Sequence, residues 1–99
     1  MFTSLKHYET VPSSVPEILR RINKEFVPLL KQINGFVSFD IVDTGKGRLI
    51  TITVFQTEIG ALKSKKVAAQ WVNSLGDLTP RLSESVSGVV VVHSERDQT

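Results

Sequence analysis

The sequence contains no cysteine, and this absence removes several kinds of chemistry at once. Without thiols the chain can form no disulfide, no cysteine nucleophile and no cysteine-ligated zinc site. Histidine is scarce too: there are two among 99 residues, far apart in the sequence and outside any cluster of metal-ligating residues. We therefore expect neither a metal site nor a cofactor.

Long apolar runs are also missing, because no stretch approaches the roughly 20 residues that span a bilayer. The start of the chain, MFTSLKHYET, lacks the basic beginning and the apolar stretch of a signal peptide. The net charge of +2 gives no basic surplus of the kind that nucleic-acid binding requires. We expect a cytoplasmic protein that binds neither membranes nor nucleic acid.

The short motifs of common enzyme classes are absent as well. There is no GxxxxGK[ST] phosphate loop, no HExxH zinc motif and no GxSxG nucleophile turn. What is present is a composition with 40% hydrophobic and 22% charged residues, which is typical of a folded globular chain. Its length predicts a single domain spanning residues 1–99.

The clearest local pattern is an amphipathic helix that begins near Val15 and ends near Ile33. Its apolar residues follow helical spacing: Val15, Ile18, Leu19, Ile22, Phe26, Leu29, Leu30 and Ile33. Ser14 and Glu17 have the spacing of a capping box. Pro28 interrupts the pattern but lies opposite the apolar stripe, so we expect a kink there whose convex side faces solvent.

The remaining elements follow from alternating patterns and turn residues. Strands are predicted over Thr3–Val11, Phe36–Asp43, Arg48–Gln56 and Val86–Ser94. The turn Thr44–Gly47 joins the middle two as a hairpin. A second helix is predicted from a Thr57 cap to about Ser74, followed by a mostly irregular segment over Asp77–Ser87. A frayed tail is expected over Glu95–Thr99.

The predicted order of elements is βαββαβ. This is the ferredoxin-like α+β arrangement, a four-stranded antiparallel sheet with both helices on one face.

Several strands are apolar on both faces, although two helices can cover only one face. We assign the purely apolar sets to the helix side: Val37, Phe39, Ile41, Ile50, Ile52 and Val54. The apolar residues then left on the open face are Phe36, Val42, Leu49 and Phe55. An exposed apolar patch of this kind usually marks an interface. Two-fold homodimers are the commonest oligomers, so we expect a homodimer.

Segments distributed along nearly the whole chain carry a resemblance to a known family. They are Asn34–Phe36, Val37–Asp40, Thr53–Phe55, Glu58–Ala61, Ala69–Val72, Leu78–Pro80 and Ser87–His93. The chain resembles the bacterial antibiotic biosynthesis monooxygenase-like family. The resemblance implies two ferredoxin-like subunits whose sheets face each other as a dimeric α/β barrel, with the helices outside. These segments mark a fold rather than a catalytic site.

The resemblance also implies a range of functions. Similar proteins include cofactor-free oxygenases of aromatic polyketides, quinol monooxygenases, haem-degrading enzymes and members of unknown activity. One reading is a small homodimeric monooxygenase-like protein that oxygenates a small aromatic compound or a quinol without a cofactor. The alternative is a non-catalytic dimer that binds a small aromatic ligand or is associated with stress, so whether the chain is an enzyme stays open here.

The haem-degrading members use a Trp in the second helix, which Trp71 matches. They also use an Asn in the first strand and a His after the second helix. The first predicted strand here has no Asn, and no His lies between Trp71 and His93. The resemblance therefore disfavours haem degradation.

Five residues are candidates for a site. His7 and His93 have side chains whose ordinary pKa lies near 7, so either could deprotonate a phenolic substrate. Tyr8 could donate a hydrogen bond, but His7 and Tyr8 cannot both face one cavity because side chains alternate along a strand. Trp71 could form a wall of a ligand pocket, and Arg48 could pair with an anionic substrate. For each of them, ordinary packing or surface exposure is the competing reading.

An RNA-recognition domain has the same order of elements, with Lys46–Gly47 at the position where its aromatic motif begins. That motif needs aromatic residues along the third strand to stack on bases, and here Phe55 stands alone at its end. A regulatory amino-acid-binding domain is a further alternative.

Overall fold

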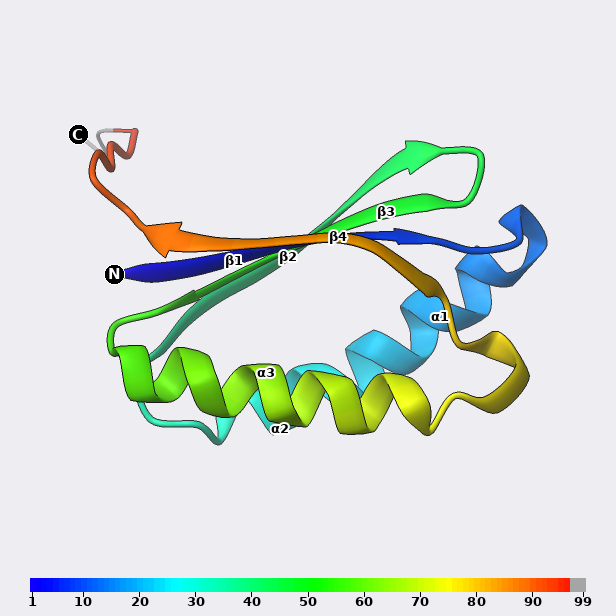
Figure 1. Ribbon diagram of the computed structural model, residues 1–99, viewed down its shortest axis with the longest axis horizontal. Helices are drawn as coiled ribbons and strands as arrows, with labels where there is room; N and C mark the ends of the chain where they lie inside the picture. The colour runs from blue at the N-terminus through cyan, green and yellow to red at the C-terminus, as the bar shows by residue number, and fades with distance from the viewer. Residues whose placement is uncertain (97–99) are drawn as a thin grey trace.

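The computed structural model describes residues 1–96. Its elements are β1 (Phe2–Glu9), the 3-10 turn η1 (Pro12–Ser14), α1 (Val15–Arg21), the π-helical turn η2 (Ile22–Phe26), α2 (Val27–Lys31), β2 (Phe36–Gly45), β3 (Arg48–Phe55), α3 (Glu58–Asn73), the 3-10 turn η3 (Gly76–Leu78) and β4 (Arg81–Val89). The sheet has the strand order β2-β3-β1-β4, and each neighbouring pair is antiparallel. The helices all lie on one side of it (Figure 1). These features confirm the ferredoxin-like α+β fold.

The first predicted helix forms as a continuous run of α1, η2 and α2. The backbone N–H of Val27 donates to the carbonyl of Ile22, five residues earlier, so this turn is wider than an α-helical turn. The wide turn lies directly before Pro28, whose ring would clash with a regular preceding turn. Pro28 itself is exposed, as its position on the helical wheel predicts.

The predicted capping box is wrong. Ser14 already has helical backbone angles, with φ −85° and ψ −14°, and its side chain accepts no capping hydrogen bond. The carboxylate of Glu17 instead accepts hydrogen bonds from Arg20 and Arg21. Because the turn η1 leads directly into α1, Ser14 lies inside the helical run and cannot act as its cap.

The caps and turns of the second half follow the prediction closely. The Thr57 hydroxyl accepts a hydrogen bond from the backbone N–H of Gly60 at 3.1 Å, and α3 follows. The hairpin between β2 and β3 turns on Lys46 and Gly47, whose φ angles are +57° and +78°. Two consecutive positive φ angles are typical of the two-residue turns that match the twist of a hairpin.

The assignment of sheet faces is wrong for β3. Leu49 is 3% exposed and Phe55 is 1% exposed, and both belong to the core under the helices. Because side chains alternate, Ile50, Ile52 and Val54 point to the open face. Counting apolar residues misled the assignment, because the face with fewer of them contains the two that are most deeply buried.

Along β2 the assignment holds in part. Phe39 and Ile41 pack against the core, and Val42, on the open face, is 43% exposed. A register irregularity between Phe36 and Ser38 interrupts the alternation. As a result Phe36 packs against Phe55, with ring centroids 5.7 Å apart, while Val37 is 41% exposed.

The last strand begins and ends earlier than predicted. β4 runs over Arg81–Val89 and so occupies most of the segment expected to be irregular, which also begins within the 3-10 turn η3. It pairs with the whole of β1, and the N–H of Val90 still donates to the carbonyl of Met1. Beyond that point β1 offers no further backbone, so the apolar run leaves the sheet and Val91 and Val92 are 88% and 84% exposed.

The tail predicted to fray falls partly on residues 97–99, which lie outside the described residues. Glu95 and Arg96 belong to no helix or strand. Within residues 1–96, no helix combines the length and the apolar character needed to cross a bilayer.

Candidate functional site

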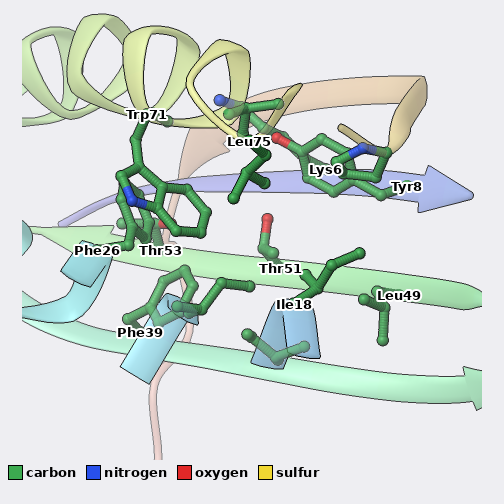
Figure 2. A pocket seen from close by; sticks show the side chains of 15 residues that line it. Lys6, Tyr8, Ile18, Phe26, Phe39, Leu49, Thr51, Thr53, Trp71 and Leu75 are labelled. Atoms are coloured by element: carbon green, nitrogen blue, oxygen red, sulfur yellow. The ribbon is translucent and has the colours of Figure 1, made fainter. Parts of the chain in front are cut away.

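A cavity of about 50 Å³ lies between the helices and the covered face of the sheet. Such a volume exceeds what one water molecule needs. Its lining residues come from β1, β2, β3, the first helical run, α3 and the segment before β4: Lys6, Tyr8, Ile18, Ile22, Phe26, Phe39, Ile41, Leu49, Thr51, Thr53, Ala68, Trp71, Val72, Leu75 and Pro80. Figure 2 shows Trp71 reaching from the helix side toward the strands.

Three aromatic rings form one wall of this cavity. Trp71 lies 5.2 Å from Phe26 between ring centroids, with the ring planes tilted by 31°. Phe26 in turn meets Phe39 edge to face, at 5.5 Å and 74°. Aromatic rings in such arrangements attract one another beyond the effect of burial alone. The wall is therefore a rigid surface against which a flat ring can lie.

Trp71 is held at its polar end as well. Its side chain is buried, and the indole Nε1–H donates to Oε1 of Glu25 at 3.2 Å. Because Glu25 lies in η2, the bond ties α3 to the wide turn of the first helical run. The orientation of the indole is thus fixed both by ring packing and by a hydrogen bond.

The opposite side of the cavity is polar, which is unusual for the covered face of a sheet. Lys6 of β1 lies directly across from Thr51 of β3, so the two side chains point to the same side. Thr53 and Tyr8 line the same hollow. The hydroxyl of Thr51 points from β3 toward the space below Leu75 and Tyr8 (Figure 2).

Burial changes the ionisation of both β1 side chains. It raises the pKa of Tyr8, which keeps the phenol neutral and able to donate a hydrogen bond. Burial, and to a smaller extent the positive charge of Lys65, lower the pKa of Lys6. Lys6 is the only charged residue in the cavity lining, and it takes part in none of the ion pairs found within residues 1–96.

Of the five residues predicted for a site, Tyr8 and Trp71 line this cavity. His7 points to the other face of the sheet, directly across from Ile50 and Glu84. His7 and Tyr8 therefore do not both face the aromatic cavity, as the alternation of side chains along a strand predicts. His93 lies past the end of β4, exposed, with Nε2 3.0 Å from Oε1 of Glu95.

Another hollow, of about 90 Å³, brings together three of the predicted residues at the hairpin end of the sheet. His7, Tyr8 and Arg48 all contribute to it. Arg48 is exposed there and does not line the aromatic cavity. Trp71 does not line this hollow, and Tyr8 is the one predicted residue that lines both.

Sequence reasoning missed Lys6, Thr51 and Thr53. Lys6 stands two residues before Tyr8 on a strand, so alternation alone places the two on one face. Thr51 and Thr53 were assigned to the open face because they interrupt the apolar pattern of β3. The signal that could have found them is the position of Leu49 and Phe55 on the same face.

No family model matches the sequence, and no curated protein matches it. Solved structures do match. A monooxygenase from Streptomyces coelicolor, the product of the gene ActVA-Orf6 in complex with the ligand nanaomycin D, is 12% identical with a TM-score of 0.73; the match covers 97% of this chain and 92% of that one. This chain shares the fold of that monooxygenase.

Two further structures agree. A dimeric ferredoxin-like protein from an uncultured marine organism is 15% identical with a TM-score of 0.70, and the match covers 96% of this chain and 97% of that one. A mutant of MhuD with two manganese protoporphyrin IX molecules bound per active site is 14% identical with a TM-score of 0.71, covering 97% and 100%. The resemblance noted in the sequence is thereby confirmed at the level of the fold.

Proposed function

We propose that this chain is a single-domain, homodimeric cytoplasmic protein that oxygenates a small aromatic compound or a quinol without a cofactor. The observation that carries the proposal is the cavity between helices and sheet, walled by Phe26, Phe39 and Trp71. Apolar hollows with a few convergent polar groups are where small ligands bind. The fold shared with a monooxygenase supports the same reading.

The reaction needs no external reductant. A phenol and one O₂ give a quinone and one water, so the ring loses four electrons and O₂ gains four. One oxygen atom enters the ring at a C–H position, and the other leaves as water with the two hydrogens that the ring and the hydroxyl give up. The apolar wall excludes water from the electron-rich ring, and Tyr8 donates a hydrogen bond to the substrate oxygen.

Neither histidine lines the cavity, so the phenolic proton has no histidine to accept it there. The substrate is therefore proposed to lose its proton to solvent and to enter as an anion. The same observation favours a second candidate function, a non-catalytic dimer that binds an aromatic ligand, since binding needs no base.

The homodimer is supported by the open face of the sheet. No described element covers this face (Figure 1). The side chains aligned on it across the four strands include Leu5, Val42, Ile50, Ile52, Val54 and Val86. A second copy of the chain would bury this apolar surface, and one of the proteins with the same fold is a dimeric ferredoxin-like protein.

The deciding experiment measures oxygen uptake with a panel of phenols, naphthols and quinols. We expect one O₂ consumed per quinone formed, with one atom of ¹⁸O₂ in the product and the other in water. The Trp71→Leu variant removes one of the three rings of the aromatic wall and should lower the uptake. Saturable quenching of Trp71 fluorescence without oxygen uptake would favour the non-catalytic binder, and neither effect with any compound would reject both functions.

A further inference from the structure

We propose that Lys6 makes the aromatic cavity an anion site, which selects flat aromatic ligands carrying an ionised oxygen, a carboxylate or a phenolate, over neutral ones of the same shape. The proposal rests on the proposed function in one respect, that the cavity is where the ligand binds. It adds the residue that recognises the negative charge, and it extends the ligands from phenolates to carboxylates.

The first observation is the place of Lys6. It stands on the covered face of the sheet, across from Thr51, and is half-buried. Core-facing strand positions rarely hold a lysine, because burying a charge without a partner is costly. An apolar side chain would suit this position better if packing were its only role.

The second observation is the missing counter-charge. Among the fifteen lining residues none is acidic, and the ion pairs within residues 1–96 do not include Lys6. The charged group that acts on it most clearly is Lys65, which is also positive. Glu25, which lies near the aromatic wall, is outside the lining and accepts the indole N–H of Trp71. The cavity therefore has a net positive side that a bound anion would neutralise.

The third observation is the set of groups beside Lys6. The hydroxyls of Tyr8 and Thr51 line the same cavity as Lys6 and can donate hydrogen bonds to a ligand there, and burial keeps the Tyr8 phenol in its neutral, donating form. Charge-assisted hydrogen bonds to an oxygen anion are roughly twice as strong as neutral ones. The aromatic wall combines Trp71 and Phe26 from the helices with Phe39 from β2, and the donors come from β1 and β3. A ligand ring would rest against Trp71 and Phe39 with its anionic oxygen toward β1 (Figure 2).

The test compares two probes that differ only in charge, 2-naphthoate and 2-naphthamide, by isothermal titration calorimetry on the full chain. We expect the wild type to bind the naphthoate about tenfold or more tightly, as one charge-assisted hydrogen bond supplies. Lys6→Met keeps the length of the side chain and removes its charge. It should abolish the preference and leave naphthamide binding within about twofold. Lys65→Met is the matched control and should keep most of the preference.

A second measurement uses the wild type alone, so its result does not depend on whether the Lys6→Met variant folds. An amine-reactive acylating reagent modifies the lysines, and mass spectrometry reads the extent at each. Naphthoate should protect Lys6 specifically, while Lys24 and Lys63 serve as internal references. Equal affinity for the two probes, no protection of Lys6, or no measurable binding of either probe at millimolar concentration would overturn the proposal.

The outcome separates this proposal from the oxygenase function. A charge preference that depends on Lys6, found without oxygen uptake from any phenol, leaves the anion site standing and removes the oxygenase. If oxygen uptake is unchanged in Lys6→Met and the wild type shows no charge preference, the oxygenase function stands and the anion site is rejected.

Discussion

At the scale of the single residue, Trp71 joins packing to polar contact. Its ring lies against Phe26, and its indole N–H donates to Glu25. A residue held in two ways can form a cavity wall and still stabilise the core. Replacing it in steps separates the two contributions.

Trp71→Ala is expected to lower the free energy of unfolding by about 3–5 kcal/mol, as large aromatic deletions do. Trp71→Phe keeps a ring against Phe26, so it leaves a smaller cavity and should lower the free energy of unfolding by less. It also loses the indole N–H, and the lost hydrogen bond should account for about 1 kcal/mol of that decrease. Urea unfolding followed by circular dichroism measures both. If Trp71→Ala cost as little as Trp71→Phe, the ring would contribute nothing to the core.

A second residue-scale prediction concerns haem, because a protein with this fold binds manganese protoporphyrin. Incubation of this chain with haem and a reductant should leave the Soret band intact. The strand β1, FTSLKHYE, contains no Asn, and no His stands between α3 and His93. Loss of the Soret band with growth of biliverdin-like absorption would contradict the prediction, and a parallel sample without protein controls for chemical bleaching.

Part of the site could be predicted from the sequence at this scale. Trp71 and Tyr8 were found because an amphipathic ring on a helix flank and a phenol on a strand are readable locally. Lys6 and Thr51 were not, because their role depends on which face of the sheet the helices cover. That choice was decided by how deeply Leu49 and Phe55 are buried, which a count of apolar residues does not measure.

At the scale of the element, the turn between β2 and β3 has a specific requirement for glycine. Gly47 has φ +78°, its carbonyl accepts from the Thr10 N–H at 2.8 Å, and an added Cβ would overlap the Thr10 carbonyl oxygen. Gly45, in the same turn, has φ +92° but nothing within 4 Å of such a Cβ. A residue with a Cβ would be strained by the positive φ at either position, but only at position 47 would the Cβ also clash with a neighbouring atom.

Gly45→Ala should therefore destabilise the chain by about 1–2 kcal/mol, the strain of a positive φ for a residue with a Cβ. Gly47→Ala should cost clearly more, because either the turn or the segment at Thr10 must move. Thermal or urea unfolding of the pair decides it. Equal costs for the two substitutions would show that the contact with Thr10 does not matter.

The first turns of α1 predict a dependence of stability on pH. Hydrogen bonds from Arg20 and then Arg21 lower the pKa of Glu17 from 4.5 to about 2. A folded-state pKa below the unfolded value adds stability above pH 4.5, and this is lost as the pH falls toward 2. The free energy of unfolding should thus fall less between pH 5 and pH 2 in Glu17→Gln than in the wild type. An identical pH profile for the two proteins would contradict this. Arg20→Met leaves the hydrogen bond from Arg21 and should give a profile between those of the wild type and Glu17→Gln.

The sequence predicted those helix ends and turns that depend on residues close by in the chain. The cap at Thr57 and the turn at Lys46–Gly47 depend on nearby backbone, and both form as expected. β4 was misplaced because its bounds depend on β1, which provides backbone partners only from Glu9 back to Met1. The serine-rich stretch before Val86 becomes a strand by pairing, and the valines after Val89 do not.

At the scale of the whole molecule, one face of the sheet has no described helix or strand packed against it (Figure 1). Each of the four strands places apolar side chains on that face, although His7, Asp40 and Glu84 lie there too. Val91 and Val92, beyond the end of β4, are exposed as well. The corrected assignment of the β3 faces changes which substitutions can test the homodimer. Phe55 was expected on this face but lies in the core, so substituting it would unfold the chain rather than separate two copies.

Ile52 is the better choice, because it stands in the middle of the open face, directly across from Leu5 on β1 and Asp40 on β2. The wild type at micromolar concentration should scatter light as a particle of about twice the 11.0 kDa chain mass. Ile52→Asp would place a second carboxylate beside Asp40 in the contact between copies, where burying unpaired charge is costly, so it should be monomeric. Ile59→Asp changes an isoleucine on α3 that is 69% exposed and should stay dimeric. A monomeric wild type would contradict the homodimer, and a dimeric, folded Ile52→Asp would place the contact elsewhere than on the open face.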